Sequence, residues 1–163
     1  MTESNVGISR SFTRNQVQKG AQSLQFATFY LGSEFFGINI LQVQEILLKQ
    51  NVTPVPQAED YILGLISLRG QIVTAVDLKR RLGKATTESV ADPYQIVVQT
   101  AGMIASFQVD RVGDVIEVSA EKVAPPPESI ETIEARFLEG VYPLETEILS
   151  ILNVEAVLET VSL

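Results

Sequence analysis

The 163-residue sequence has no cysteine, no histidine and no tryptophan. Without cysteine the chain has neither disulfides nor a thiolate nucleophile, and without histidine it has no imidazole base for work near neutral pH. Zinc sites with thiolate or imidazole ligands are excluded for the same reason, so that only carboxylate sites for hard cations remain. These absences exclude the many enzyme mechanisms that depend on a cysteine or a histidine side chain.

Basic residues are scarce in the C-terminal half. The formal net charge is −8, and residues 91–163 hold thirteen acidic against three basic residues, whereas residues 1–23 carry a charge of +2. Nucleic-acid binding needs a basic footprint, so we expect no nucleic-acid partner. The acidic half instead indicates a solvated surface or a partner with basic patches.

Long hydrophobic runs are also missing. Residues 1–22 are polar and contain scattered cations but no apolar core, unlike a secretory signal. The longest uncharged run, residues 93–109, is too short and too polar to span a bilayer. We therefore expect a soluble intracellular protein without direct membrane insertion.

The pattern of apolar runs, glycines and prolines occurs twice in the chain. Residues 1–23 lack any pattern, and we interpret them as a flexible polar tail before a domain that fills the rest of the chain. Beyond the tail, five segments recur in the same order at offsets of 69–76 residues, so that Gly32 is matched by Gly102. Any two β-rich segments share apolar runs, but this order favours two similar subdomains, about 32–83 and 94–150. Each is too small to bury a core alone, so we expect them to pack together and leave a groove between them.

Local patterns predict short strands joined by tight turns. Proposed strand pairs flank Gly32-Ser33 and Arg69-Gly70, where glycine permits a positive φ. We expect a helix over 78–82 that is capped by Asp77 and closed by Gly83, and a C-terminal helix over 153–161 capped by Asn153. The remaining expectations are a short amphipathic helix over 43–49, helical turns within 59–63 and 128–138, a link between the units over 86–92, and a turn at Gly140.

The acids and bases available for catalysis are carboxylates, lysines and tyrosines. No spacing singles out a pair of carboxylates, and the glycine-rich phosphate loops are missing. We therefore predict a protein that is not an enzyme and that holds no cofactor or metal. A carboxylate-dependent enzyme acting in the groove between the two units is the alternative, and a nucleic-acid-binding barrel is a weaker one.

A single cation stands in the apolar stretch 61–73. Arg69 there either ties down backbone carbonyls or anchors a partner, since its planar head suits carboxylates and arginine is enriched at interface hot spots. The residues alone leave these two roles equally open.

The motifs around Arg69 resemble those of the CheW domain of bacterial chemotaxis, over about residues 24–160. They are V-Q-E-I at Val43–Ile46, G-L-I-S-L-R-G-Q-I-V at Gly64–Val73, V-D-L at Val76–Leu78, and the second-half motif at Val109–Val115. Three positions depart from the usual family pattern: Ser67 replaces an asparagine, Ala105-Ser106 a glycine, and Asn153 an aspartate.

The resemblance implies a mainly β fold of two five-stranded, SH3-like barrels related by a pseudo-two-fold, with short helices and a C-terminal helix. It implies a non-catalytic, cytoplasmic adaptor that is recruited to membrane receptor arrays. There it couples the helical tip of a methyl-accepting chemoreceptor to the regulatory domain of a CheA-type histidine kinase. That kinase domain shares the resemblance, but the chain has no histidine to phosphorylate, so we expect the adaptor. Residues implied to bind partners are Arg69, Glu45, Val43, Gly64 and Val112, and residues expected to be structural are Gly70, Asp77, Asn153, Gly32 and Gly102.

Overall fold

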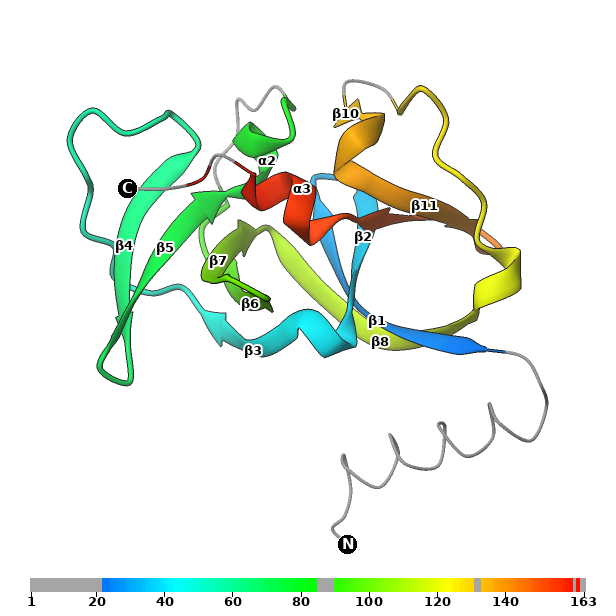
Figure 1. Ribbon diagram of the computed structural model, residues 1–163, viewed down its shortest axis with the longest axis horizontal. Coiled ribbons are helices and arrows are strands. Elements are labelled where there is room, and N and C mark those ends of the chain that lie inside the picture. The colour runs from blue at the N-terminus through cyan, green and yellow to red at the C-terminus, as the bar shows by residue number, and fades with distance from the viewer. Residues whose placement is uncertain (1–21, 85–89, 131–132, 160, 162–163) are drawn as a thin grey trace, which may run out of the picture.

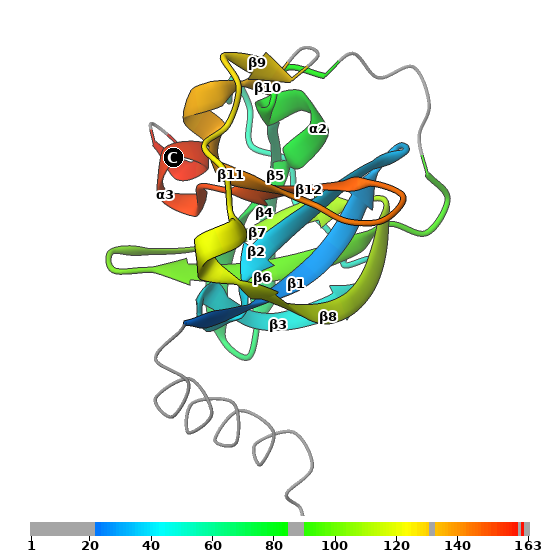
Figure 2. The same cartoon turned by 90° about the vertical axis from the view of Figure 1, so that its right-hand side faces the viewer.

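The computed structural model describes residues 22–84, 90–130, 133–159 and 161, and it is built mainly of β-strands (Figures 1 and 2). Sheet 1 has the order β11 (Leu138–Pro143), β12 (Ile148–Leu152), β2 (Glu34–Asn39), β1 (Ser23–Leu31), β8 (Arg111–Ser119). Sheet 2 has the order β3 (Val43–Leu48), β6 (Tyr94–Thr100), β7 (Met103–Val109), β5 (Gln71–Asp77), β4 (Ile62–Leu68). The short elements are β9 (Ser129–Ile130), β10 (Ile133–Glu134), α2 (Leu78–Arg81), α3 (Val154–Leu158), η1 (Ile40–Gln42), η2 (Ala120–Lys122) and η3 (Ala135–Phe137). The predicted mainly β fold with two five-stranded units and short helices is confirmed.

Each sheet takes one hairpin from the other half of the chain. The β1–β2 hairpin of the first half joins β8, β11 and β12, and the β6–β7 hairpin of the second half joins β3, β4 and β5. In both sheets the exchanged hairpin is held by a parallel pairing on one side, β2 with β12 and β7 with β5, and by an antiparallel pairing on the other, β1 with β8 and β6 with β3. The pairing order is thus repeated, as a pseudo-two-fold relation predicts.

Because of this exchange, neither sheet is built from one of the predicted ranges 32–83 and 94–150 alone. Strand β1 pairs with β8 of the other half. The tight turn at Gly32 keeps β2 paired with β1, so the two strands join the other sheet together as a hairpin. The second half returns a hairpin in the same way.

One apolar cluster joins the two sheets, as expected of units that cannot form cores alone. Sheet 1 contributes Phe29 and Phe36, sheet 2 contributes Ile96 and Phe107, and α3 adds Val157; each is at most 1% exposed. In Figure 1, sheet 2 lies on the left, sheet 1 on the right, and both helices lie between them. The C-terminal helix therefore packs at the junction, although it is shorter than the predicted 153–161, of which residue 160 lies outside the described residues.

Several predicted turns and caps are present. Gly32 (φ +63°), Arg69 (φ +51°) and Gly70 (φ +80°) all adopt positive φ, so that the β4–β5 hairpin turns on two left-handed residues. Gly102, which lies in the β6–β7 turn, does not. The side chain of Asp77 accepts a hydrogen bond from the N–H of Arg80, and that of Asn153 accepts one from the N–H of Ala156.

Other local predictions are wrong or only partly right. Residues 43–48 form strand β3 rather than a helix, because pairing with β6 satisfies their backbone and their side chains alternate in exposure. A turn is present within 59–63, where the N–H of Ile62 donates to the carbonyl oxygen of Glu59, and the short helix η3 lies within 128–138 beside two short strands. Gly140 lies inside β11, where a Cβ would meet the carbonyl oxygen of Ala124 at 2.7 Å, so it serves a close approach and not a turn.

The tail 1–23, except its last two residues, and residues 86–89 of the predicted link lie outside the described residues. Among the residues that are described, no helix is long and apolar enough to cross a membrane.

Candidate partner-binding surface

Arg69 and Glu45 come from opposite edges of sheet 2. Arg69 lies at the tip of the β4–β5 hairpin and Glu45 lies on β3, and their Nη1 and Oε2 atoms are 2.5 Å apart. The sheet therefore curls until its edges approach. The Arg69 side chain is 75% exposed and that of Glu45 only 17%. The ion pair thus holds an exposed guanidinium over a largely covered carboxylate.

Arg69 makes few contacts with the part of the chain that the structure describes. Its bond to Glu45 is its only one among the described residues, and it does not tie down carbonyl groups. Most of the five N–H donors of the guanidinium remain available to a partner. Of the two roles that the residues left open, this geometry fits the anchor.

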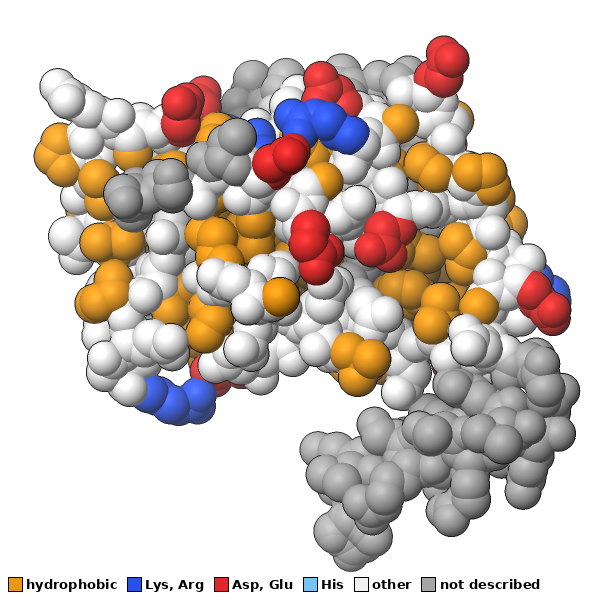
Figure 3. Space-filling model, viewed as in Figure 1, with side chains coloured by type: hydrophobic (Ala, Val, Ile, Leu, Met, Phe, Trp, Pro, Cys, Tyr) orange, Lys and Arg blue, Asp and Glu red, His pale blue; other side chains and the backbone are white. Residues whose placement is uncertain are grey.

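Exposed apolar side chains lie on the same unit. Ile46 and Leu48 are 41% and 65% exposed on β3, an edge strand whose only ladder among the described residues is with β6. Leu41 on η1 and Ile72 on β5 are 89% and 64% exposed. Figure 3 shows hydrophobic side chains gathered on the left of the view, where Figure 1 places sheet 2. An edge strand with apolar outward residues is a natural docking site.

The other residues named as partner-binding lie deeper. Val43 and Val112 are half-buried against the shared core, one on β3 and the other on β8 of sheet 1. Gly64 is buried at φ +143°, and a Cβ there would collide with the carbonyl group of Thr53. Glycine is needed there so that the Thr53 segment can bridge to Leu65, and the contact of Gly64 with a partner stays a prediction.

Comparison with known proteins agrees with this architecture. The family model described as CheW-like domain matches residues 25–162. The chain belongs to the CheW-like family. It is 36% identical over 138 residues to the chemotaxis protein CheW of Treponema pallidum, covering 82% of this chain and 81% of that protein. It is 32% identical over 133 residues to that of Rhizobium meliloti, covering 82% and 86%. A solved structure of the scaffolding protein TtCheW from Thermoanaerobacter tengcongensis superposes with a TM-score of 0.79 at 29% identity, covering 85% of this chain and 94% of that one.

In this CheW-like chain, basic residues at and after α2 join the two sheets, a role that the sequence analysis missed. Lys79 pairs with Asp110 at 3.0 Å, and the same carboxylate accepts a hydrogen bond from the N–H of Gly32 at 2.7 Å. Arg81 donates to the carbonyl oxygens of Val157 and Glu159, both at 2.7 Å. Lys84 pairs with Glu34 at the start of β2. The run V-D-L-K-R-R-L-G-K could have indicated this role, because it places four cations on and just after a short helix, where acceptors from other segments can pair with them.

Among the described residues, no three or more carboxylates gather into a group that could hold a metal ion. Burial raises the pKa of Glu139 above its usual value, and the nearby charge of Glu155 raises it further. Glu155 is also contacted by the side-chain amide of Gln42. Nothing in this arrangement supports the alternative of a carboxylate-dependent enzyme.

Proposed function

We propose that this chain is a non-catalytic scaffold that couples the helical cytoplasmic tip of a methyl-accepting chemoreceptor to the regulatory domain of a CheA-type histidine kinase. The observation that carries the proposal is the exposed Arg69, held by Glu45 beside the apolar edge strand β3. Membership of the CheW-like family and the names of the relatives, which are chemotaxis and scaffolding proteins, support it.

The surface has the chemistry that an amphipathic helix requires. Ile46 and Leu48 offer apolar contact on the outer face of β3, and Arg69, held by Glu45 on the other face of that strand, offers forked donors that match a carboxylate better than an ammonium group does. Because the protein would reach the membrane only through its receptor, the proposed location is the cytoplasmic side of a receptor array.

The test replaces Arg69. Arg69→Ala should leave the melting temperature nearly unchanged, because the side chain is exposed, and should weaken binding by about 2 kcal/mol, or ~30-fold. Arg69→Lys should restore only part of the affinity. Binding is measured by calorimetry with a soluble receptor cytoplasmic fragment and, separately, with the kinase regulatory domain.

Two further variants serve as controls. Arg136→Ala removes another exposed arginine, which pairs with Glu134 and Glu159, and should leave binding unchanged. Arg69→Gly removes the left-handed strain and should raise stability by up to about 1 kcal/mol, while it weakens binding as Arg69→Ala does. Wild-type affinity of Arg69→Ala for both partners would overturn the anchor role.

A further inference from the structure

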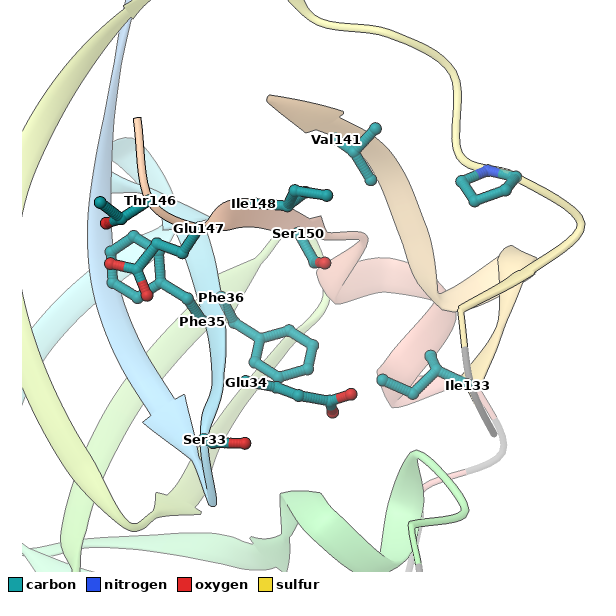
Figure 4. A pocket seen from close by; sticks show the side chains of 11 residues that line it. Ser33, Glu34, Phe35, Phe36, Ile133, Val141, Thr146, Glu147, Ile148 and Ser150 are labelled. Atoms are coloured by element: carbon teal, nitrogen blue, oxygen red, sulfur yellow. The ribbon is translucent and has the colours of Figure 1, made fainter. Parts of the chain in front are cut away.

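Sheet 1 carries a second apolar cluster, apart from the core that it shares with sheet 2. Successive side chains of a strand point to opposite faces, so Phe36 of β2 lies in the shared core and Phe35 lies in the second cluster (Figure 4). Half-buried apolar side chains border this second cluster: Leu24, Tyr30, Ile116, Val123, Tyr142 and Leu144. Figure 3 shows hydrophobic side chains around a hollow on the right of the view, where Figure 1 places sheet 1. The second cluster is therefore an apolar face that is only partly covered.

Two acidic side chains lie beside this face. A Cβ on Gly140 would meet the side chain of Val123 at 2.7 Å, so the border of the second cluster adjoins β11, where Glu139 precedes that glycine. Glu155 lies close enough to Glu139 for their charges to repel each other. Neither carboxylate forms an ion pair with a cation of the described residues. The apolar face thus has two acids at its border that lack a counter-charge.

The N-terminal residues are tethered next to the same face. The carbonyl oxygen of Gln22 accepts a hydrogen bond of 2.9 Å from the N–H of Ala120, at the start of η2, and η2 leads directly to Val123. Residues 1–21 lie outside the described residues, and their sequence carries a net positive charge. Two apolar side chains alternate there with two arginines, in the order Ile8, Arg10, Phe12, Arg14. A short linker holds a segment near its site at an effective concentration on the order of millimolar, so a weak contact is enough for docking.

We propose that residues 8–14 fold back onto the second cluster of sheet 1 and cover it. Their two apolar side chains pack against the half-buried residues that border the cluster, and their two arginines donate to the carboxylates of Glu139 and Glu155. The docked segment excludes other partners from this face until it is displaced. The contact lies on sheet 1 and does not depend on the scaffold function proposed above.

A spin label on the N-terminal segment tests where the segment lies. Because the chain has no cysteine, Asn15→Cys gives a single attachment site for a nitroxide in the full-length protein. In ¹H–¹⁵N correlation spectra the label should broaden the amides around Val123 and Glu139 and spare those of the β4–β5 hairpin on sheet 2. Equal broadening over both sheets would overturn the proposal. So would broadening in a mixture of spin-labelled protein with separate ¹⁵N-labelled protein, because the segment would then dock on a second copy of the chain.

Charge reversal on sheet 1 separates docking from the proximity that the tether alone provides. Glu139→Lys/Glu155→Lys should reduce the broadening at least about threefold, because two attractive ion pairs become repulsive. Glu59→Lys/Asp60→Lys makes the same change of charge on exposed residues just before β4 and is the matched control, which should leave the broadening unaltered. Equal broadening in both double variants would show that the acids beside the second cluster do not hold the segment.

Reversing the arginines gives the complementary variant. Arg10→Glu/Arg14→Glu should reduce the broadening as the sheet 1 variant does, and combining it with Glu139→Lys/Glu155→Lys should restore the broadening, since opposite charges then face each other again. If the sheet 1 variant fails to fold, the arginine variant decides alone, because both of its substitutions precede the first strand. Unchanged broadening in the arginine variant would overturn the proposal.

Discussion

The β4–β5 hairpin of sheet 2 and the β11–β12 hairpin of sheet 1 occupy matching places but differ at their tips. At the base of each, a glycine follows a bulge and lets another segment bridge to the strand: Gly64 beneath Thr53, and Gly140 beneath Ala124. Beyond each hairpin a capped helix begins, at Asp77 in one and at Asn153 in the other.

The tips carry opposite charges. The first is a two-residue turn that presents Arg69 over Glu45, whereas the second is the longer connection 144–147 with Glu145 and Glu147. In the repeat, Asp114 of sheet 1 corresponds to Glu45 of sheet 2. Because the second tip carries glutamates instead of an arginine, Asp114 has no cation there with which to form the equivalent ion pair. The residues that shape the frame are thus repeated, whereas the charge at the two tips is not.

The largest effect is expected from cutting the chain between the halves. A fragment of residues 24–86 keeps β3, β4 and β5 but loses β6 and β7, which lie at positions two and three of sheet 2. The exposed apolar faces should make it aggregate or remain unfolded. Circular dichroism and chemical denaturation provide the measurement. A soluble fragment that unfolds cooperatively would show that the halves are independent.

Alanine at the two frame glycines should reveal how closely the hairpins match. Gly64→Ala combines a left-handed φ with a backbone collision and should cost more than about 3 kcal/mol of unfolding free energy. Gly140→Ala meets a backbone oxygen at 2.7 Å without a positive φ and should cost less, about 1–3 kcal/mol. Gly102→Ala, in open space, is the control and should change stability by under about 0.5 kcal/mol. Urea denaturation measures all three variants. If Gly140→Ala changed the midpoint as little as Gly102→Ala does, the two hairpins would not share the same glycine requirement.

The two helix caps should give the smallest effects. Asp77→Ala and Asn153→Ala should each lower the free energy of unfolding by about 0.5–2 kcal/mol, because each removes an acceptor from a helix N-terminus. Asp77→Asn, which copies the cap of the other helix, should be nearly neutral. Denaturation at constant pH tests all three variants, and an unchanged midpoint in Asp77→Ala would show that this side chain is not the cap.

The sequence predicted features that a few neighbouring residues determine. Glycine at positive φ, the caps at Asp77 and Asn153, and the repeat were all visible in short segments. The 43–48 strand was mistaken for a helix because apolar residues at 43, 46 and 47 fit either period in so short a window. Pairings between distant segments leave no local pattern in a single sequence, so neither the exchanged hairpins nor the contact of Arg69 with Glu45 could be predicted from it. The same applies to the acceptors of Lys79 and Arg81.

The exchange of hairpins also has a consequence for the timing of folding during synthesis. Sheet 2 lacks its second and third strands until residue Val109 has been made, although three of its strands were complete by Asp77. Sheet 1 begins with Ser23 and must wait for Leu152 before its last strand exists. Translation at about 5–20 residues per second leaves the β1–β2 hairpin without β11 and β12 for several seconds. During that interval its unpaired edge is open to wrong partners, so the emerging chain is most exposed to misassembly before either sheet can close its strand order.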